Sequence, residues 1–201
     1  MRFLFYLFLL ISVSSFAKEV LIENGLKSVP VIVGDEVISI TRNQDRKHNI
    51  MKFYQGTWRG KIQPLHPFKS PLVETVAELE VIDYIDQISH GDDSILIVDS
   101  RPQSAIMITG KIPGAVRIDT KQLLSLEDRK SAFKRFNVAW KDNQWDFSNA
   151  KTLVLYCNGF WCGKSPRMIR KLLILDYPAN KLKYYRGGMQ AWRSVGLTTV
   201  K

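Results

Sequence analysis

Short apolar runs alternate with stretches of helical periodicity over the second half of the chain. Strands are expected at 94–99, 115–118, 152–156 and 182–185, where apolar and β-branched residues cluster between turn signals. Helices are expected at 73–89 and 166–175, where apolar residues recur at intervals of three and four, with a stretch of mixed helix at 120–137 and a closing helix at 189–194. This alternation predicts an α/β domain with an open parallel sheet of about five strands and helices on both faces.

The preceding segment is less regular. Two short strands at 30–34 and 37–40 flank a Gly-Asp-Glu turn and predict a hairpin. Residues 56–71 hold three prolines and two glycines, so we expect an irregular linker that packs on the main domain. We therefore divide the chain into a leader at 1–17, an extension and linker of unknown role at 18–72, and the α/β domain at 73–201.

The leader resembles a secretory signal peptide. Phe3 to Phe16 is almost wholly apolar, and Ser15-Phe16-Ala17 offers a small-x-small cleavage site. The run is shorter than the ~20 residues that a membrane span needs. We expect an exported protein, periplasmic or secreted, whose mature chain begins at Lys18 and has no stable membrane span. An uncleaved N-terminal anchor is the alternative.

Composition limits the class of ligand. A hydrophobic content of 45% and a charged content of 24% are ordinary for a globular protein. The formal net charge is +10, but the basic residues form no dense stripe with interleaved aromatics, so nucleic acid is not expected. The excess charge favours small anionic substrates or an acidic protein partner.

Candidate chemistry gathers around Cys157. It follows the apolar run 152–156 and precedes a small loop, after which Ser165 is expected to cap a helix whose first residue is Pro166. Loop amides and the positive end of that helix would favour a thiolate. Because ligand sites lie at the carboxyl ends of parallel strands, we prefer a reactive thiol to the alternative, a buried core cysteine.

The chain has only one other cysteine, Cys162, which lies in the same loop. A disulfide between them would close a small ring and add little stability, so their placement favours chemistry over structure. The three histidines are scattered, and no metal or cofactor is expected.

Three motifs in order resemble those of the rhodanese family. The first is Asp-Ser-Arg at 99–101 followed by Gly-Lys-Ile-Pro-Gly-Ala at 110–115, with Lys111 where the family has His. The second is Tyr156-Cys157 with the downstream Gly and Ser165, and the third is Arg-Gly-Gly-Met-Gln-Ala-Trp at 186–192. The resemblance covers roughly residue 73 to the C-terminus and implies a rhodanese-like fold.

The resemblance also implies a sulfurtransferase. The Cys157 thiolate would take sulfane sulfur from a thiosulfate-like donor as a persulfide, and a thiol or cyanide acceptor would then remove it. The donor-binding loop would comprise Asn158, Gly159, Phe160, Trp161, Gly163, Lys164 and Ser165. Its amides would form an anion nest, and Gly159 and Gly163 would supply positive φ values. Lys164 would attract the donor or be a solvated surface charge. The two aromatics would wall the site or would only shield the loop.

Other residues would play supporting or alternative parts. Asp99 and Arg101 are expected to brace the loop or to form a buried ion pair at the sheet edge. Trp192 is expected to pack in the core. The loop is longer than that of typical rhodaneses, and Cys162 is an additional thiol, so the donor's identity stays open.

Two other functions remain alternatives. In a thiol–disulfide redox module, Cys162 would resolve a persulfide, sulfenate or mixed disulfide on Cys157. The rhodanese fold also serves as a non-catalytic interaction domain. A phosphatase is less favoured, because Gly163 or Lys164 stands where that chemistry would need an arginine.

Overall fold

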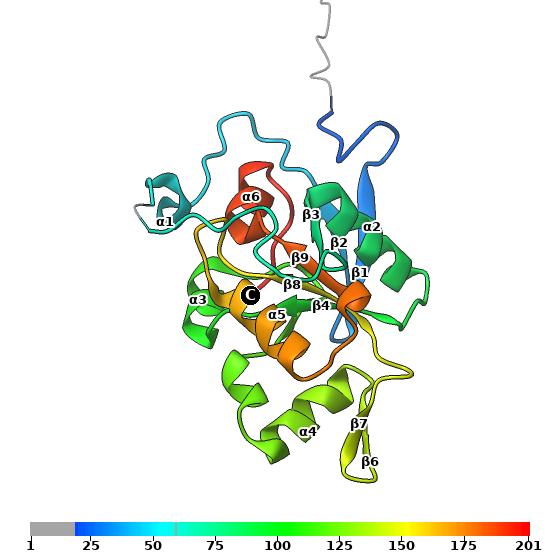
Figure 1. Ribbon diagram of the computed structural model, residues 1–201. Coiled ribbons are helices and arrows are strands. Elements are labelled where there is room, and N and C mark those ends of the chain that lie inside the picture. Colours follow the sequence, from blue (N-terminus) through cyan, green and yellow to red (C-terminus); the bar gives the residue numbers. More distant parts are fainter. Residues whose placement is uncertain (1–18, 59) are drawn as a thin grey trace, which may run out of the picture.

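The computed structural model describes residues 19–58 and 60–201; the leader predicted at 1–17 lies outside them. It confirms the α/β fold with a five-stranded parallel sheet of order β3-β9-β8-β4-β5 (Figure 1). The strands are β3 (Glu74–Val76), β4 (Ile95–Asp99), β5 (Val116–Arg117), β8 (Thr152–Tyr156) and β9 (Leu182–Tyr185). The central strand is therefore β8, the strand that leads into Cys157.

Helices cover both faces of the sheet, as predicted. Helices α2 (Glu78–Ser89) and α6 (Gly188–Ser194) contribute to one apolar cluster, and α4 (Leu126–Arg135) and α5 (Lys164–Ile174) contribute to the other. Successive residues of β8 alternate between them, because neighbouring side chains of a strand point to opposite faces: Leu153 and Leu155 join the α4/α5 cluster, and Val154 and Tyr156 join the α2/α6 cluster.

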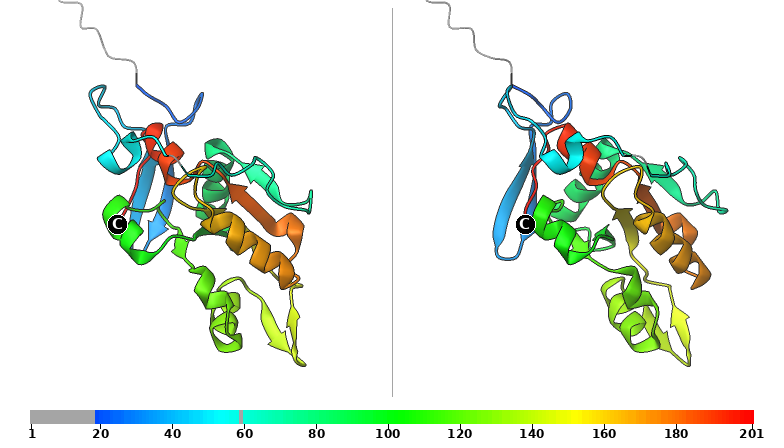
Figure 2. Two further views of the ribbon diagram at one scale, coloured as in Figure 1. Left: turned by 60° about the vertical axis from the view of Figure 1, so that its left-hand side comes forward. Right: turned by 90° about the vertical axis from the view of Figure 1, so that its left-hand side faces the viewer.

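The extension adds a further layer. Strands β1 (Ser28–Val33) and β2 (Glu36–Thr41) form the antiparallel hairpin that the sequence predicts. Val29, Val31 and Ile40 are buried in the cluster that contains α2. Figure 2 shows this hairpin on the opposite side of the molecule from α5. The extension is thus part of the folded core and not a loose appendage.

The single helix expected at 73–89 is wrong in its first part. Residues Glu74–Val76 instead form the edge strand β3, which pairs with β9, and α2 begins at Glu78. A carboxylate oxygen of Glu80 accepts a hydrogen bond from the backbone N–H of Ala77 at 2.9 Å, which marks the helix start. Spacing alone missed this boundary because Val76 is apolar and in phase with both elements.

Strands β6 (Ala139–Lys141) and β7 (Gln144–Asp146) form a small antiparallel hairpin between α4 and β8. Its turn residues Asp142 and Asn143 have φ values of 46° and 62°, the left-handed conformation that tight hairpin turns require. Trp140 packs edge-on against Trp145 with ring centroids 4.5 Å apart. The helix expected at 120–137 is divided into a short 3-10 helix, η1 (Thr120–Leu123), and α4. Short elements that the pattern did not predict are α1 (Lys52–Gln55), α3 (Gln103–Thr109) and η2 (Ala179–Lys181).

In the part of the chain that the structure describes, we find no helix with the length and apolar character that crossing a membrane requires.

Candidate functional site

Cys157 lies at the carboxyl end of the central strand, as the sequence predicts. Strand β8 ends at Tyr156, and the adjacent strands β4 and β9 end in register with it at Asp99 and Tyr185. The carboxyl edge of an open parallel sheet is where such folds place their ligand sites. The cysteine and its loop therefore occupy the position that a site in this fold requires.

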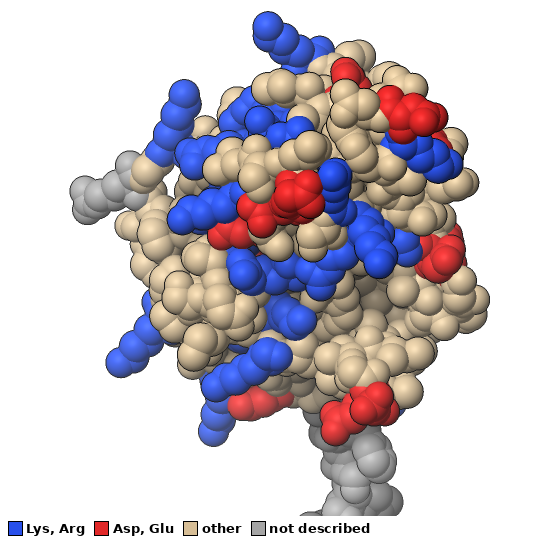
Figure 3. Space-filling model, turned by 90° about the horizontal axis from the view of Figure 1, so that it is seen from below, with Lys and Arg blue, Asp and Glu red and all other residues tan. Residues whose placement is uncertain are grey.

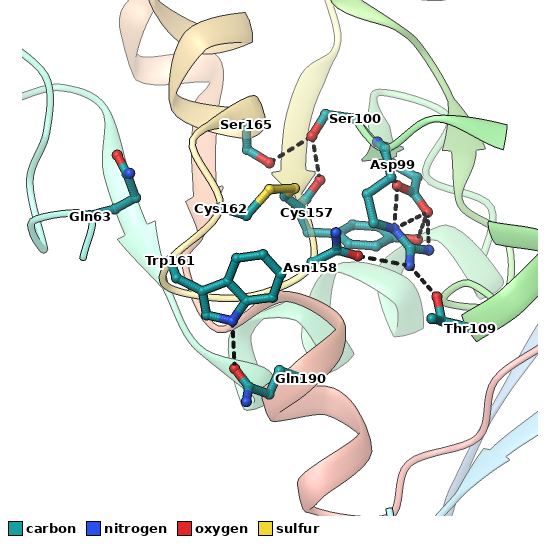
Figure 4. The surroundings of a disulfide bond; sticks show 12 residues. Gln63, Asp99, Ser100, Thr109, Cys157, Asn158, Trp161, Cys162, Ser165 and Gln190 are labelled. Atoms are coloured by element: carbon teal, nitrogen blue, oxygen red, sulfur yellow. Dashed lines mark hydrogen bonds and ion pairs between the residues drawn. A yellow bond between two sulfur atoms is a disulfide. The ribbon is translucent and has the colours of Figure 1, made fainter. Parts of the chain in front are cut away.

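Cys157 and Cys162 are joined by a disulfide, with their Cα atoms 6.2 Å apart (Figure 4). Cys157 is 2% exposed and Cys162 is 7% exposed. The loop between them is closed by a hydrogen bond of 2.8 Å from the N–H of Cys162 to the carbonyl oxygen of Gly159. In this state neither sulfur is a thiolate, so any nucleophilic chemistry at Cys157 requires prior reduction.

The start of α6 holds the first residues of the loop. The N–H groups of Met189 and Gln190 donate to the carbonyl oxygens of Cys157 and Asn158 at 3.0 and 2.8 Å. Gly188 lies between β9 and these two residues. Its φ is +57°, and a Cβ atom at this position would collide with the Cys157 carbonyl. A glycine is required there on both counts.

The helix after the loop begins earlier than predicted. Helix α5 starts at Lys164 with Gly163 at its N-cap, so the expectation of Ser165 as cap and Pro166 as first residue is wrong. The Ser165 side chain is fully buried, with its Oγ 2.8 Å from Oγ of Ser100. Because Ser100 Oγ donates to the carbonyl of Tyr156 at 2.7 Å, Ser165 donates to Ser100. Its hydroxyl thus joins α5 to the end of the sheet.

The expected positive φ values in the loop are also wrong. Gly163 has a φ of −83°, and Gly159 is absent from the residues with positive φ. The presence of glycine at position 159 is explained by steric crowding instead. A Cβ atom there would lie 2.9 Å from Oε1 of Gln190 and 3.0 Å from Nε1 of Trp161. Close packing by the Gln190 and Trp161 side chains, and not backbone strain, favours glycine at this position.

Asp99 and Arg101 form the buried ion pair that was one of the expectations. Both are fully buried, and Nη2 of Arg101 lies 2.6 Å from Oδ2 of Asp99. Arg101 also donates to Oγ1 of Thr109 and to the carbonyl of Gly110, each at 2.7 Å, and its Nη1 lies 3.5 Å from Oδ1 of Asn158. The pair therefore braces the sheet edge and contacts the residue that follows Cys157.

Tyr156 completes this network. Its hydroxyl donates to Oδ2 of Asp99 at 2.8 Å and accepts from the N–H of Ile112 at 3.1 Å. Burial and the Asp99 charge hold the pKa of Tyr156 well above its usual value. Burial lowers the pKa of Arg101, but the hydrogen bonds and charge of Asp99 outweigh that effect and raise it. The network thus joins a neutral phenol to a buried ion pair.

Residues of the extension cover the loop, which the sequence did not predict. The Tyr54 hydroxyl donates to Oδ1 of Asn158 at 3.2 Å. The Trp58 ring stacks on Trp161 with centroids 3.6 Å apart, and the N–H of Gln63 donates to the carbonyl of Phe160 at 2.9 Å. These partners lie about a hundred residues from the loop in sequence, so no local pattern could reveal them.

Two residues of the third motif hold this cover in place. Gln190 accepts from Nε1 of Trp161 at 3.0 Å and donates to the carbonyl of Tyr54 at 3.3 Å. Arg186 donates to the carbonyl of Gln63 at 2.9 Å, and its guanidinium lies 5.6 Å from the centre of the Phe160 ring. In the sequence, the only signal for Gln190 and Arg186 is that both belong to the third motif, at 186–192.

A family model for the rhodanese-like domain matches residues 82–195, more than half of the chain. The chain belongs to the rhodanese-like domain family. The rhodanese-like fold expected from the three motifs is therefore confirmed. The family contains sulfurtransferases and also members without catalytic activity.

Several solved structures are similar to this rhodanese-like chain. A protein of unknown function from Rhodopseudomonas palustris, described as a possible tyrosine phosphatase, is 25% identical with a TM-score of 0.42, over 63% of this chain and 84% of that one. A single-domain sulfurtransferase from Saccharomyces cerevisiae is 18% identical with a TM-score of 0.41, over 64% and 95%. A Rhodanese_3-like domain from Anabaena is 20% identical with a TM-score of 0.36, over 52% and 97%. No curated protein matches the chain.

The charged and aromatic loop residues of the rhodanese-like domain lie near its surface. Lys164 is exposed and forms no ion pair with any residue that the structure describes, while Phe160 is 37% exposed. Trp161 is half-buried beneath Trp58, and Trp192 is a fully buried core residue, as expected.

Figure 3 shows Lys and Arg side chains gathered over the middle of one face, with Asp and Glu in smaller separate groups. Residues 19–58 and 60–201 contain no group of three potential metal ligands from His, Cys, Asp and Glu.

Proposed function

We propose that this rhodanese-like domain is a sulfurtransferase whose nucleophile is Cys157 in the reduced protein. The observation that carries the proposal is the position of this cysteine. It follows the central strand, at the carboxyl edge of the sheet, and precedes the eleven-residue helix α5. The helix N-terminus favours an anionic sulfur there over a neutral thiol.

The loop has unused donors for an anion. The backbone N–H groups of Asn158, Gly159, Phe160 and Trp161 donate no hydrogen bond to any residue that the structure describes. In the reduced protein such amides would stabilise the thiolate, the persulfide and the oxygens of a bound donor. Lys164 and Arg167, both exposed in the first turn of α5, would raise the local concentration of an anionic donor.

The reaction divides into two transfers. The Cys157 thiolate attacks the outer sulfur of a thiosulfate-class donor, forming an S–S bond while the bond to the sulfonate sulfur breaks and sulfite leaves. A thiophilic acceptor, such as cyanide or a thiolate, then attacks the outer sulfur of the persulfide. Cys157 leaves as a thiolate, ready for another donor. The Asp99–Arg101 pair supports the loop through Asn158 and takes no part in the bond changes.

The test is sulfite release from thiosulfate in the presence of cyanide, after the protein has been reduced and the reductant removed. Wild type should release sulfite and Cys157→Ser should release none above the uncatalysed rate. Equal rates for the two proteins would overturn the proposal. Circular dichroism of Cys157→Ser would show that its fold is retained, since the serine is close in size to the buried cysteine.

A second candidate function, thiol–disulfide exchange, is favoured by the Cys157–Cys162 bond itself. In that case the pair would pass electrons between dithiol partners without handling sulfane sulfur. Sulfite release distinguishes the two when the reduced protein is mixed with thiosulfate. Release of sulfite favours sulfur transfer, and exchange with disulfide substrates without any sulfite release favours the redox function.

We also propose that the protein works outside the cytoplasm, from the apolar run at 3–16 and the Ser15-Phe16-Ala17 site. Mass spectrometry of exported protein should find a chain that begins at Lys18. An intact Met1 would contradict this.

A further inference from the structure

We infer that Cys162 resolves the Cys157 persulfide, releasing its outer sulfur as hydrosulfide and leaving the disulfide seen in the structure. The inference rests on the proposed function, because it needs a persulfide on Cys157. It adds a second activity: the domain would reduce sulfane sulfur at the expense of a dithiol, instead of only passing that sulfur to an acceptor.

The first support is the position of the second thiol. The Cα atoms of Cys157 and Cys162 are 6.2 Å apart, and their sulfurs are bonded without interrupting β8 or α5. The turn that brings them together is closed by the Cys162 N–H to Gly159 carbonyl bond, and the loop start is held by α6. The folded loop therefore presents Cys162 directly to the sulfur that would carry the persulfide, which gives it the advantage of an intramolecular reactant.

The second support is the restricted access of other acceptors. Both cysteines are buried, at 2% and 7% exposure. Trp161 is covered by Trp58, and the loop is tied down through Gln63 and Gln190. Figure 4 shows Trp161 beside the disulfide with Gln63 on the outer side of the loop. A bulky external thiol would have to displace this cover, whereas Cys162 is already inside it.

The bond changes balance. The Cys162 thiol loses its proton, and its sulfur attacks Sγ of Cys157, forming the Cys157–Cys162 bond. The bond between Cys157 Sγ and the outer sulfur breaks, and its electron pair leaves with the outer sulfur, which takes the proton and departs as hydrosulfide. The outer sulfur is reduced and Cys162 is oxidised. An external dithiol, the reductant class that the cycle needs, then reduces the disulfide by exchange and is itself oxidised to a disulfide.

Summed over one cycle, thiosulfate and a dithiol give sulfite, hydrogen sulfide and the oxidised dithiol. The first half, donor cleavage with sulfite release, belongs to the proposed function. The second half, hydrosulfide release with disulfide formation, belongs to this inference alone. The two halves have different products, so they can be measured separately.

The experiment is a single turnover with the full chain. The protein is reduced with dithiothreitol, freed of it without air, and mixed with thiosulfate. Sulfite, hydrosulfide, free thiols and intact mass are then measured. We expect one sulfite and one hydrosulfide per chain, loss of both free thiols, and the mass of the disulfide form. Sulfite release with the extra sulfur still on Cys157 and Cys162 still free would overturn the inference while leaving the proposed function intact.

Cys162→Ser sharpens the test. The ratio of hydrosulfide to sulfite released should be at least about tenfold lower in this variant than in wild type, because no intramolecular thiol remains. Equal hydrosulfide per sulfite in the two proteins would also overturn the inference. No sulfite from wild type would instead show that the proposed function fails. Because the wild-type measurement is decisive by itself, the conclusion does not depend on the variant folding.

Discussion

The hydroxyl of Tyr54 donates a hydrogen bond of 3.2 Å to Oδ1 of Asn158, and so joins the extension to the residue after Cys157. The two residues lie 104 positions apart in sequence. Tyr54 is 2% exposed, and burial raises the pKa of its hydroxyl, so that hydroxyl stays a neutral donor at physiological pH. The extension therefore takes part in shaping the loop.

Tyr54→Phe should loosen this loop. Removing one buried donor should lower the free energy of unfolding by about 1 kcal/mol. It should also speed reduction of the Cys157–Cys162 disulfide by dithiothreitol, because the loop start has lost a restraint. Urea denaturation and stopped-flow thiol release measure the two effects. The matched control is Tyr177→Phe, which removes a hydroxyl that donates to the Lys151 carbonyl away from the loop. If both variants speed reduction equally, Tyr54 has no specific effect on the loop.

Trp58→Ala should uncover the disulfide loop. The Trp58 and Trp161 rings are stacked at 3.6 Å, and a stacked aromatic pair contributes about 0.5–1.5 kcal/mol beyond its buried area. We expect faster reduction by a small dithiol and a larger gain with a protein dithiol, since the larger reagent is more hindered by the cover. Trp140→Ala, which disrupts an aromatic pair in the distant β6–β7 hairpin, is the control. An unchanged reduction rate in Trp58→Ala would contradict the covering role.

Asp99→Ala should be strongly destabilising. It would leave the Arg101 guanidinium charged and fully buried without its partner, and the Tyr156 hydroxyl without its acceptor. Removing one member of a buried pair costs about 3–5 kcal/mol. Chemical denaturation measures the loss, and Asp146→Ala, which breaks a surface pair with Lys141, should stay close to wild type. Similar stability losses in the two variants would show that the buried network contributes no more to the free energy of unfolding than the surface pair does.

Stability should fall above pH 10. Burial raises the pKa of all six tyrosines that the structure describes: Tyr54, Tyr84, Tyr156, Tyr177, Tyr184 and Tyr185. In the unfolded chain they ionise near pH 10, so the unfolded state there binds fewer protons than the native state. The free energy of unfolding then decreases as pH rises, by up to about 1.4 kcal/mol per pH unit for each such tyrosine.

Tyr184→Phe isolates one of these groups. Burial raises the pKa of Tyr184 to about 12, and its buried hydroxyl has no hydrogen-bond partner among the described residues. The substitution should therefore leave stability at pH 7 unchanged or slightly higher, and should make the decline between pH 10 and about pH 12 shallower. Urea denaturation across this range checks both. A steep loss of stability at pH 7 would contradict the structure around this hydroxyl.

Local sequence patterns predicted most of the fold. The run 152–156 has the apolar character of a central strand, and the motifs around Cys157 and Gly188 follow the adjacent strands β8 and β9, so the sequence placed Cys157 at the carboxyl edge of the sheet. The edge strand β3 escaped detection because three residues beside a helix show no periodicity of their own.

What the sequence could not reveal depends on distant contacts. Ser165 resembles a helix cap in its local context, but Ser100, 65 residues away, holds its hydroxyl in the interior. Gly159 resembles a residue of positive φ, whereas the crowding that favours glycine there comes from the Trp161 side chain and from Gln190 on α6. The covering residues Tyr54 and Trp58 come from an irregular segment whose packing only the folded structure defines.

The most direct test of the central claim is the intact mass of reduced Cys162→Ser after incubation with thiosulfate. In that variant a persulfide cannot be resolved within the loop, so it should accumulate. We predict a gain of one sulfur atom per chain, mapped to Cys157 by peptide analysis and absent when Cys157 is also replaced by serine. A protein that stays folded and reduced yet gains no sulfur would contradict the account.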